Sequence, residues 1–453
     1  MEKEKAQKTE NKTRQQDAKR ISLTDAATIE LLVTNTVTYI QGVVSSECYG
    51  QLKKAIGFYP EEASFIVQNF QEKHTVNGEV AEWAKNWDGM ISTLCYDKAR
   101  CRCSVSREGM HFPTGLLSRV RAFFKKKGIQ FTIRDGRKIL TKQIDYSMSD
   151  EFEPRTYQKE IMDAACLKGR GIIQMATGGG KTAVSASIIA ELGVSPFIFY
   201  VTSVDLLNQA KDEMEKFIRQ NNAAITVGTI GNGKFDPQEI TVMTIQTAIR
   251  ALGGTWVKYD DEDKTKVDST LDDRRKDIKD LIVSAKGMMC DEVQHWASET
   301  CRIIADYSIS ARYRYGLSAT PWRDKGDDIL IDACFGKPLA QINASYLIKR
   351  GYLVKPSIYF VKVNNAMGSG LRSYPKIYKK AISENPVRNE IIAKSAEGFR
   401  DSGRLVLILC KHIAHGKLLQ SMIPDSHFLC GATSAKKRKI HLDSMRNRDA
   451  GVT

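Results

Sequence analysis

The chain has 453 residues, of which 42% are hydrophobic and 27% are charged. This composition is that of an ordinary globular protein and excludes a collagen, a low-complexity chain and a solenoid repeat. The length predicts two to four domains, because single cores stop growing at about 250 to 300 residues. The 68 lysines and arginines outnumber the 53 aspartates and glutamates, and the net charge of +15 favours a polyanion partner without identifying one.

Neither a membrane anchor nor a disulfide framework is expected. The longest apolar stretches, such as residues 195–201, are much shorter than the roughly 20 residues that span a bilayer, and residues 1–20 are charged, unlike a signal peptide. The ten cysteines are scattered, which is typical of reduced thiols. Cys95, Cys101 and Cys103 cluster, but no second pair of ligands completes a zinc pattern. We expect a cytoplasmic protein with no membrane partner.

Residues 1–20 are polar and predict a flexible tail, whereas residues 21–146 predict a small α/β module. Apolar runs at 27–40 and 129–133 predict strands, and the apolar side chains of residues 114–127 recur at helical spacing. This helix and its flanks are strongly basic, which predicts DNA binding through phosphate contacts, although a solvated basic helix is the alternative. The expected contacts are Arg119, Lys125, Lys126 and Lys127.

Residues 146–154 are polar and acidic and end in a proline, which predicts a linker. From Arg155 onward, β-like apolar runs alternate with helical stretches, which predicts an α/β fold with a parallel sheet covered by helices on both faces. The predicted strands are residues 171–175, 197–201, 240–244, 287–290 and 313–317. The charged residues 259–279 predict a solvated insertion or a helix. A second series at 357–363, 405–409 and 427–430 supplies too few strands for a complete sheet. We therefore expect one lobe at 147–345 and a partial second lobe at 346–453.

A glycine-rich turn from Ala176 to Thr182 follows the predicted strand 171–175 and leads into a helix. Glycines let backbone N–H groups surround phosphate oxygens, while a lysine reaches the β- and γ-phosphates and a hydroxyl ligates Mg²⁺. The strict pattern has a glycine where Met175 stands, and a glycine-rich turn beside a surface lysine is the alternative. The expected nucleotide-binding residues are Thr177, Gly178, Gly179, Gly180, Lys181 and Thr182, with Thr182 also a magnesium ligand.

Two acidic residues, Asp291 and Glu292, end the predicted strand 287–290. One carboxylate can hold Mg²⁺ while its neighbour positions and deprotonates the attacking water. We expect Asp291 to take the first role and Glu292 the second, in a catalytic set completed by Lys181 and His295. An isolated acidic pair is more often a solvated turn, and it is the phosphate loop upstream that favours catalysis.

The segment Asp291-Glu292-Val293-Gln294-His295 resembles motif II of the superfamily 2 DExH helicases, and other motifs of that family occur in the expected order. The resemblance implies RecA-like lobes and the cofactors ATP and Mg²⁺. Arg155-Thr156-Tyr157-Gln158 resembles the adenine-recognition motif, in which Gln158 reads the base and Arg155 supports it. Residues 317–324 resemble motif III, which implies that Gln294, Ser318, Ala319 and Thr320 couple hydrolysis to movement.

Motifs Ia to Ic of the family contact the phosphate backbone of one strand, a task that suits short hydroxyl side chains and exposed backbone. The positions here that match them, together with the arginine after motif III, are Thr202, Ser203, Gly231, Thr244, Gln246 and Arg323. A turn or a helix cap is the alternative at any one of these positions. Residues 86–89, 112–117 and 127–129 resemble the N-terminal domain of phage recombination helicases, which implies a host-cell cytoplasmic location if the gene is carried by a phage.

Motif V and the arginine-finger motif VI of the family do not occur before Thr453. A fragment of a longer protein, or a short form that needs a partner polypeptide to complete the second lobe, would explain this. In either case we expect the chain alone to bind ATP and DNA but to hydrolyse ATP slowly. The expected function is an ATP-dependent DNA helicase or translocase acting on branched or duplex DNA in recombination, repair or fork processing. The alternatives are an RNA helicase, a restriction-type DNA translocase and an ATP-switched nucleic-acid-binding protein.

Overall fold

The structure is a computed structural model that describes residues 29–61, 63–76, 79–80, 85, 87–95, 109–253, 271–323, 326–363, 370 and 372–447. The chain divides into two compact units, residues 1–355 and 356–453. Helix α13 (Ala344–Lys349) and the turn that follows it therefore belong to the first unit. Within the described residues, none of the helices combines the length and the hydropathy that crossing a bilayer requires.

The N-terminal module contains a sheet with the strand order β7-β2-β1-β8. Its strands are β1 (Ile29–Val33), β2 (Val37–Gln41), β7 (His111–Pro113) and β8 (Phe131–Asp135). The stretch 27–40 was predicted as one strand, but its described residues 29–40 form a hairpin, because the backbone N–H of Thr34 bonds to the carbonyl of Val37 at 2.9 Å and reverses the chain. Strand β1 is antiparallel to β2 and parallel to β8.

The predicted basic helix is confirmed as a 3-10 turn, η1 (Thr114–Leu116), followed by α5 (Leu117–Lys126). Its apolar face packs into the module core through Val120 and Phe124, which are fully buried. Lys125 and Lys126 in its last turn are exposed, as helical spacing predicts. The remaining elements of the module are α2 (Ser46–Ala55), β3 (Gly57–Phe58), α3 (Ala63–Lys73), β4 (Thr75–Val76), β5 (Glu79–Val80) and β6 (Ile91–Ser92).

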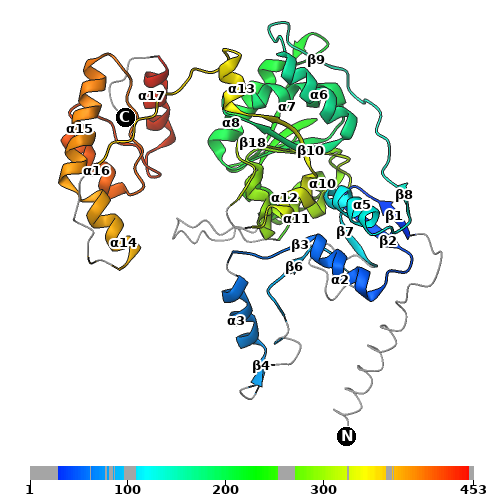
Figure 1. Cartoon of the computed structure of the whole chain (residues 1–453). Helices are drawn as coiled ribbons and strands as arrows, with labels where there is room; N and C mark the ends of the chain where they lie inside the picture. The colour runs from blue at the N-terminus through cyan, green and yellow to red at the C-terminus, as the bar shows by residue number, and fades with distance from the viewer. Residues whose placement is uncertain are drawn as a thin grey trace. The chain divides into compact units, whose positions relative to one another are not determined.

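The rest of the first unit, residues 147–355, which we call the motor part, is built on a sheet with the order β15-β14-β16-β11-β17-β18-β10-β19 (Figure 1). Its strands are β10 (Arg170–Met175), β11 (Phe197–Val201), β14 (Gly228–Gly231), β15 (Lys234–Asp236), β16 (Ile240–Thr244), β17 (Gly287–Cys290), β18 (Tyr313–Ser318) and β19 (Pro338–Ile342). All paired neighbours are parallel except β14 and β15. The α/β fold and the five predicted strands are confirmed, and β14, β15 and β19 were not predicted.

Helices cover both faces of this sheet because successive residues of each central strand point to opposite sides. Ile172 of β10 and Met288 of β17 join one buried cluster, whereas their neighbours Ile173 and Met289 join the other. The first cluster includes α9 (Ile245–Ala251), α10 (Leu271–Ser284), η2 (Val293–Ala297), α11 (Glu299–Tyr307) and α12 (Ile329–Phe335), and the second includes α6 (Thr156–Lys168), α7 (Lys181–Leu192) and α8 (Val204–Phe217). Helix α10 occupies part of the predicted insertion at 259–279, of which residues 259–270 lie outside the described residues.

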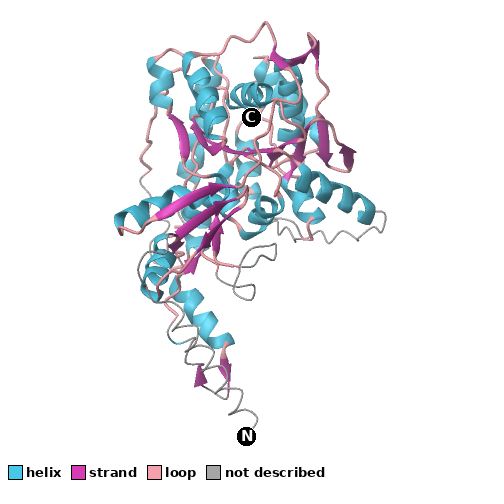
Figure 2. Cartoon of the chain, turned by 90° about the vertical axis from the view of Figure 1, so that its right-hand side faces the viewer, coloured by secondary structure: helices cyan, strands magenta, loops and turns pink. Residues whose placement is uncertain are grey.

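A small sheet with the order β13-β12-β9 includes β9, which is labelled in Figure 1; Figure 2 shows the strands of the chain in magenta among the helices in cyan. The small sheet is formed by β9 (Tyr146–Met148), β12 (Ile218–Gln220) and β13 (Ala223–Ala224). The pairing of β9 with β12 fastens the predicted linker at 146–154 to the end of α8, so the beginning of that segment is part of the motor fold.

The N-terminal module packs directly on the motor part. Gly115 of η1 lies so close to α12 that a Cβ on it would overlap the backbone carbonyl oxygens of Asp332 and Ala333. Beside it, Arg119 of α5 forms an ion pair with Asp332 at 3.0 Å. On the other side of the module, Arg170 donates a hydrogen bond of 2.7 Å to the carbonyl of Asn35. The two predicted domains, residues 21–146 and 147–345, thus have separate sheets within one compact unit.

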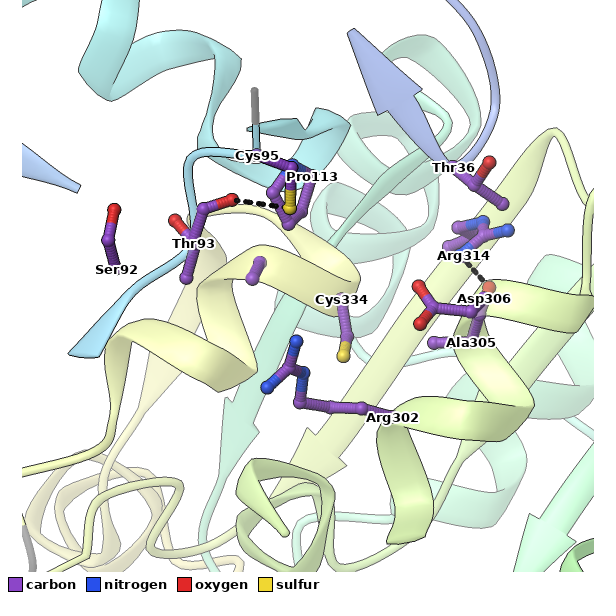
Figure 3. Close-up of a pocket in the computed structure, with 11 residues that line it drawn as sticks. Thr36, Ser92, Thr93, Cys95, Pro113, Arg302, Ala305, Asp306, Arg314 and Cys334 are labelled. Atoms are coloured by element: carbon purple, nitrogen blue, oxygen red, sulfur yellow. Dashed lines mark hydrogen bonds between the residues drawn. The ribbon is translucent and has the colours of Figure 1, made fainter. Parts of the chain in front are cut away.

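Figure 3 shows a small cavity of about 20 Å³ at this contact. Thr93 and Cys95 approach it from the module, and Arg302 and Cys334 approach it from the motor. The guanidinium of Arg314 donates to the backbone carbonyls of Ala305, Ala311 and Ser308. Across the described residues, no group of three or more His, Cys, Asp or Glu side chains is arranged to hold a metal ion, and Cys101 and Cys103 lie outside these residues.

The second unit is a helical structure in its described residues. Its helices are α14 (Tyr374–Ile377), a π-helical segment (Tyr378–Ser383), α15 (Pro386–Asp401), α16 (Ile413–Met422) and α17 (Ala435–Arg446). The strands predicted at 357–363, 405–409 and 427–430 are wrong, because these segments belong to no ladder in the described part of the unit, where only the single bridge residues Val406 and Ser426 are assigned. Apolar runs alone do not make strands, which need a hydrogen-bonded neighbour. Phe360 and Leu409 are accordingly 96% and 86% exposed.

Candidate functional site

The phosphate loop lies between the end of β10 and the start of α7, which begins at Lys181. Gly178 and Gly180 have φ values of +80° and +83°, a conformation that favours glycine. A Cβ on Gly179 would collide with the side chain of Met175 and the carbonyl of Ala176. The three glycines therefore set the path of the loop, and the first turn of α7 points its free N–H groups toward the space that the loop surrounds.

The structure brings the lysine of this loop next to the acidic pair that follows β17. The Nζ atom of Lys181 lies 3.9 Å from Oδ1 of Asp291 and 3.7 Å from Oε1 of Glu292. Strand β18 lies between β10 and β17 in the sheet, so both segments leave the same edge two strands apart. The backbone N–H of Asp291 bonds to the carbonyl of Tyr200 at 3.0 Å, which holds the start of the acidic turn against β11.

Asp291 is suited to hold a metal ion. Its Oδ1 atom is buried and accepts no hydrogen bond from the described residues. Burial raises the pKa of this carboxyl, the positive charge of Lys181 lowers it, and the negative charge of Glu292 raises it again. A buried carboxylate oxygen without a donor is stabilised by a divalent cation. The hydroxyl of Thr182, at the start of α7, is the second candidate oxygen ligand.

Glu292 begins a hydrogen-bonded chain that leads to motif III. Its backbone is in the left-handed region at φ +50°, which is uncommon outside glycine and typical of functional turns. The amide of Gln294 donates to Oε2 of Glu292 at 2.8 Å, and the hydroxyl of Ser318 donates to Oε1 of Gln294 at 2.7 Å. The backbone N–H of Thr320 in turn donates to the Ser318 hydroxyl at 3.0 Å.

The other predicted residues of this region lie around that chain. Arg323 donates from its guanidinium to the backbone carbonyl of Gln294 at 3.2 Å and forms an ion pair with Asp327 at 3.3 Å. The carbonyl of Ala319 accepts from the side-chain amide of Gln174 in β10 at 3.4 Å. His295 is exposed, and its backbone N–H closes a turn onto the carbonyl of Glu292 at 3.1 Å. These contacts connect the acidic turn, motif III and the strand that precedes the phosphate loop.

Arg155 and Gln158 lie against the phosphate loop from α6. The side-chain amide of Gln158 donates to the carbonyl of Gly179 at 3.1 Å, and its oxygen accepts from the backbone N–H of Arg155 at 2.9 Å. Sequence reasoning missed Tyr157, whose hydroxyl donates to the same Gly179 carbonyl at 2.7 Å. It also missed Tyr352, whose ring centre lies 4.2 Å from the Arg155 guanidinium carbon. Gln158, predicted to read the base, thus holds the loop in this structure.

The five residues predicted from motifs Ia to Ic come together at the carboxyl ends of β11, β14 and β16. The amide of Gln246 donates to the carbonyl of Thr202 at 2.7 Å, and Gly231 lies so close to Thr244 that a Cβ there would contact its side chain. The hydroxyl of Ser203 caps α8 by accepting from the N–H of Leu206. Their grouping on one edge is the arrangement that a phosphate-contacting surface needs.

The basic residues of α5 divide into two groups. Lys125, Lys126 and Lys127 are exposed and available to a polyanion. The guanidinium of Arg119 instead forms an ion pair with Asp332, and this contact holds the module against the motor part.

Comparison with known proteins gives the same overall result as the motifs. Residues 151–323 match the family described as type III restriction enzyme, res subunit. The chain is similar to the DNA 3'-5' translocase XPB2 of Sulfurisphaera tokodaii (28% identity, 62% of this chain, 55% of that protein) and to the ATP-dependent DNA helicase uvsW of Enterobacteria phage T4 (22% identity, 78% and 68%).

Among solved structures, the chain is similar to the crystal structure of the UvsW helicase from bacteriophage T4, with a TM-score of 0.48 and 18% identity over 69% of this chain and 99% of that one. The chain spans about half the length of the XPB2 translocase and of a putative Rad25 helicase of Haloarcula marismortui, to which it is 26% identical. The resemblance to superfamily 2 helicases that the motifs predicted is confirmed.

Proposed function

We propose that this chain, whose residues 151–323 match the family described as type III restriction enzyme, res subunit, is an ATP-dependent DNA helicase or translocase that acts on branched or duplex DNA. The observation that carries the proposal is the short distance between Lys181 and the acidic pair Asp291 and Glu292. The lysine follows β10 and the acidic pair follows β17, and both strands end at the same edge of the sheet. Two of the similar proteins are named as a DNA translocase and a DNA helicase, which supports DNA over RNA as the polymer.

Each residue of the proposed catalytic site has one task. The ammonium of Lys181 stabilises the negative charge that builds on the β- and γ-phosphates, and the N–H groups at the start of α7 bind the phosphate oxygens. The carboxylate of Glu292, held by Gln294, orients the attacking water and takes its proton. Asp291 and Thr182 would hold Mg²⁺, which when bound neutralises charge on the phosphate oxygens.

Coupling of hydrolysis to DNA follows from the contacts of Gln294. Its side chain bonds to Glu292 on one side and to Ser318 on the other, so a change at the γ-phosphate reaches motif III through two hydrogen bonds. The DNA track is proposed to run over Thr202, Gly231 and Thr244 toward the lysines of α5, with the phosphate backbone as the contacted group.

A further polypeptide that completes the second unit is also part of this proposal. Residues 358–361 form an extended apolar run of which every side chain is at least 64% exposed, and Leu407 and Leu409 are likewise exposed. Segments of this kind are stabilised when neighbouring strands pair with them. Additional strands, from this gene product or from a partner, would bury these side chains.

The proposal is tested by measuring ATP hydrolysis with forked DNA, linear duplex, single-stranded DNA and RNA at one salt concentration. Stimulation by forked or duplex DNA that exceeds stimulation by RNA is expected. Preferential stimulation by RNA would replace DNA by RNA as the substrate. Absence of nucleotide binding by calorimetry would refute the ATP site itself, whichever polymer was present.

A further inference from the structure

A second cavity, of about 320 Å³, lies where the N-terminal module meets the motor. Asn35 of the β1–β2 turn and the segment after β8 line it from the module, and the residues just before β17 and β18 line it from the motor. It is therefore at the amino ends of these parallel strands, the edge of the sheet opposite to the phosphate loop. The nucleotide site and this cavity share no lining residue.

The walls of this cavity are positively charged. Four of its lining residues are cationic, namely Arg137, Lys138, Lys286 and Arg312, and none of the described residues that line it is acidic. Arg170, at the start of β10, adds a fifth cation directly behind Asn35, to whose carbonyl it donates a hydrogen bond. Four cations thus line a space between parts of the chain that are far apart in sequence, and Arg170 lies beside it without lining it.

Several donors in this cluster have no acceptor in the described structure. The Nη1 atom of Arg312 and the Nε and Nη1 atoms of Arg170 are buried without a hydrogen-bond partner. Burial lowers the pKa of Arg170 well below its usual value, and the positive charges of Arg314, Arg137 and Arg312 lower it further. Burial and the charge of Arg137 likewise lower the pKa of Arg312. A buried guanidinium that leaves some of its donors without an acceptor is costly unless a negative charge nearby offsets its positive charge.

The carboxylate that faces this cluster does not balance it. Asp135 forms an ion pair with Arg137, is 46% exposed, and has a pKa lowered mainly by its hydrogen bond from Arg137. The positive charge of Arg314 repels the other cations of the cluster, but its guanidinium donates hydrogen bonds to backbone carbonyls. In the described structure, one half-exposed carboxylate therefore faces the four lining cations and the neighbouring Arg170, and several guanidinium donors have no acceptor.

We infer that this cavity binds a phosphate oxyanion. Guanidinium groups match the oxygen geometry of phosphate, and lysine ammonium groups add charge without imposing an angle. The volume exceeds that of a single phosphate group, so the ligand is either a phosphodiester of a nucleic-acid backbone or a free phosphate or pyrophosphate. Bound there, the anion joins the module to the motor, because Arg137 and Lys138 come from one and Lys286 and Arg312 from the other.

The test uses the full chain and its variants Lys138→Gln and Lys286→Gln, with Lys216→Gln as a control. Lys216 is exposed at the end of α8 and lines none of the described cavities, so it removes the same charge elsewhere. Thermal unfolding is followed in pyrophosphate and in sodium chloride of equal ionic strength. Pyrophosphate is expected to raise the unfolding temperature of the native chain and of Lys216→Gln, and to bind each cavity variant about tenfold more weakly.

A parallel titration with duplex DNA at several salt concentrations identifies the source of the phosphate. If the cavity variants lower the slope of log affinity against log salt by about 0.9 relative to the control, the anion is a DNA phosphate. If the slope is unchanged while pyrophosphate stabilisation is lost, the anion is a free phosphate. Equal pyrophosphate stabilisation of the native chain and the cavity variants, or no stabilisation of any of them, would overturn the inference.

Discussion

The hydroxyl of Ser318 and the side-chain carbonyl of Gln294 are joined by a hydrogen bond of 2.7 Å, and the amide nitrogen of the same glutamine donates to Glu292. A single side chain thus connects the proposed water-activating carboxylate to motif III. Because an amide has a distinct donor and acceptor end, both bonds can form at once only in one orientation of Gln294. In the proposed mechanism, a displacement of Glu292 on product formation would be transmitted to Ser318 through these two bonds.

Ser318→Ala should reduce the stimulation of ATP hydrolysis by DNA while leaving hydrolysis without DNA nearly unchanged. The variant keeps Lys181, Asp291 and Glu292, so ATP hydrolysis without DNA is expected to remain within about threefold of the native rate. Stimulation by DNA should fall about tenfold, because the bond to Gln294 is lost, and stability should fall by about 1 kcal/mol. Ser308→Ala is the matched control, since it removes another buried serine hydroxyl, which donates to the carbonyl of Ile304. Equal loss of stimulation in the two variants would show a stability effect only.

Lys181→Ala should abolish hydrolysis and weaken nucleotide binding. The ammonium is the cation that lies within 4 Å of both acidic residues in the described site, and its removal leaves phosphate charge uncompensated. The rate constant for hydrolysis is expected to fall at least about a hundredfold, the range seen for loss of one transition-state donor. Lys159→Ala, on the exposed face of α6, is the control in the same ATPase assay. Hydrolysis at native rate in Lys181→Ala would exclude this site.

Glu292→Gln should separate binding from chemistry. Glutamine preserves the size of the side chain and can still accept from Gln294, but it cannot take a proton. Hydrolysis should fall about 10² to 10⁴-fold, while the dissociation constant for ATP changes little. The measurement is single-turnover hydrolysis beside equilibrium binding, with Glu191→Gln on the exposed surface of α7 as control. A parallel loss of binding and hydrolysis would assign Glu292 to nucleotide binding instead.

The raised pKa of Asp291 predicts that the free energy of unfolding of the nucleotide-free chain depends on pH. Its folded pKa is raised from 3.8, mainly by burial, so its contribution to stability is fully present below pH 3.8 and is lost as the pH rises through the folded pKa. Asp291→Asn should therefore be more stable than the native chain near pH 7, by about 1.4 kcal/mol for each unit of the shift, and the difference should disappear toward pH 4. Urea unfolding from pH 4 to 8 measures this, with Asp212→Asn on α8 as an exposed control. A less stable Asp291→Asn at pH 7 would reverse the assignment.

The lysines of α5 should contribute to DNA affinity through charge. The double variant Lys125→Gln, Lys126→Gln is expected to lower the salt slope of duplex binding by about 0.9 for each phosphate contact that is lost. The control is Lys53→Gln, Lys54→Gln, because these lysines also occupy the last turn of a helix of the same module. An equal decrease in both double variants would mean that net charge, and not α5, determines DNA affinity.

Much of the first unit could be predicted because its strands are buried on both sides. Runs such as 197–201 and 287–290 are continuously apolar and short, which is typical of central parallel strands. Their ends then determine where polar side chains gather, so the proximity of Lys181 to Asp291 followed from their positions after β10 and β17. The hairpin at Thr34 was missed, because its turn contains no glycine or proline to interrupt the pattern.

Contacts between distant segments could not be predicted in the same way. Tyr352 lies over Arg155 because the chain returns to α6 after β19, and neither residue carries a local signal of that contact. Gln158 bonds to the Gly179 carbonyl only because α6 and the loop are brought together by the sheet. In the second unit, apolar runs predicted strands, but a strand also needs a partner at its edge, which a run of residues does not reveal.

Gly115 has a mechanical consequence. Because not even a methyl group fits between η1 and the end of α12, the module has no clearance for sliding at this point, and the Arg119 ion pair with Asp332 closes the same gap from the side. A phosphate bound by Lys125 or Lys126 would then move together with the ATP-hydrolysing lobe, because the module cannot shift relative to that lobe at this contact.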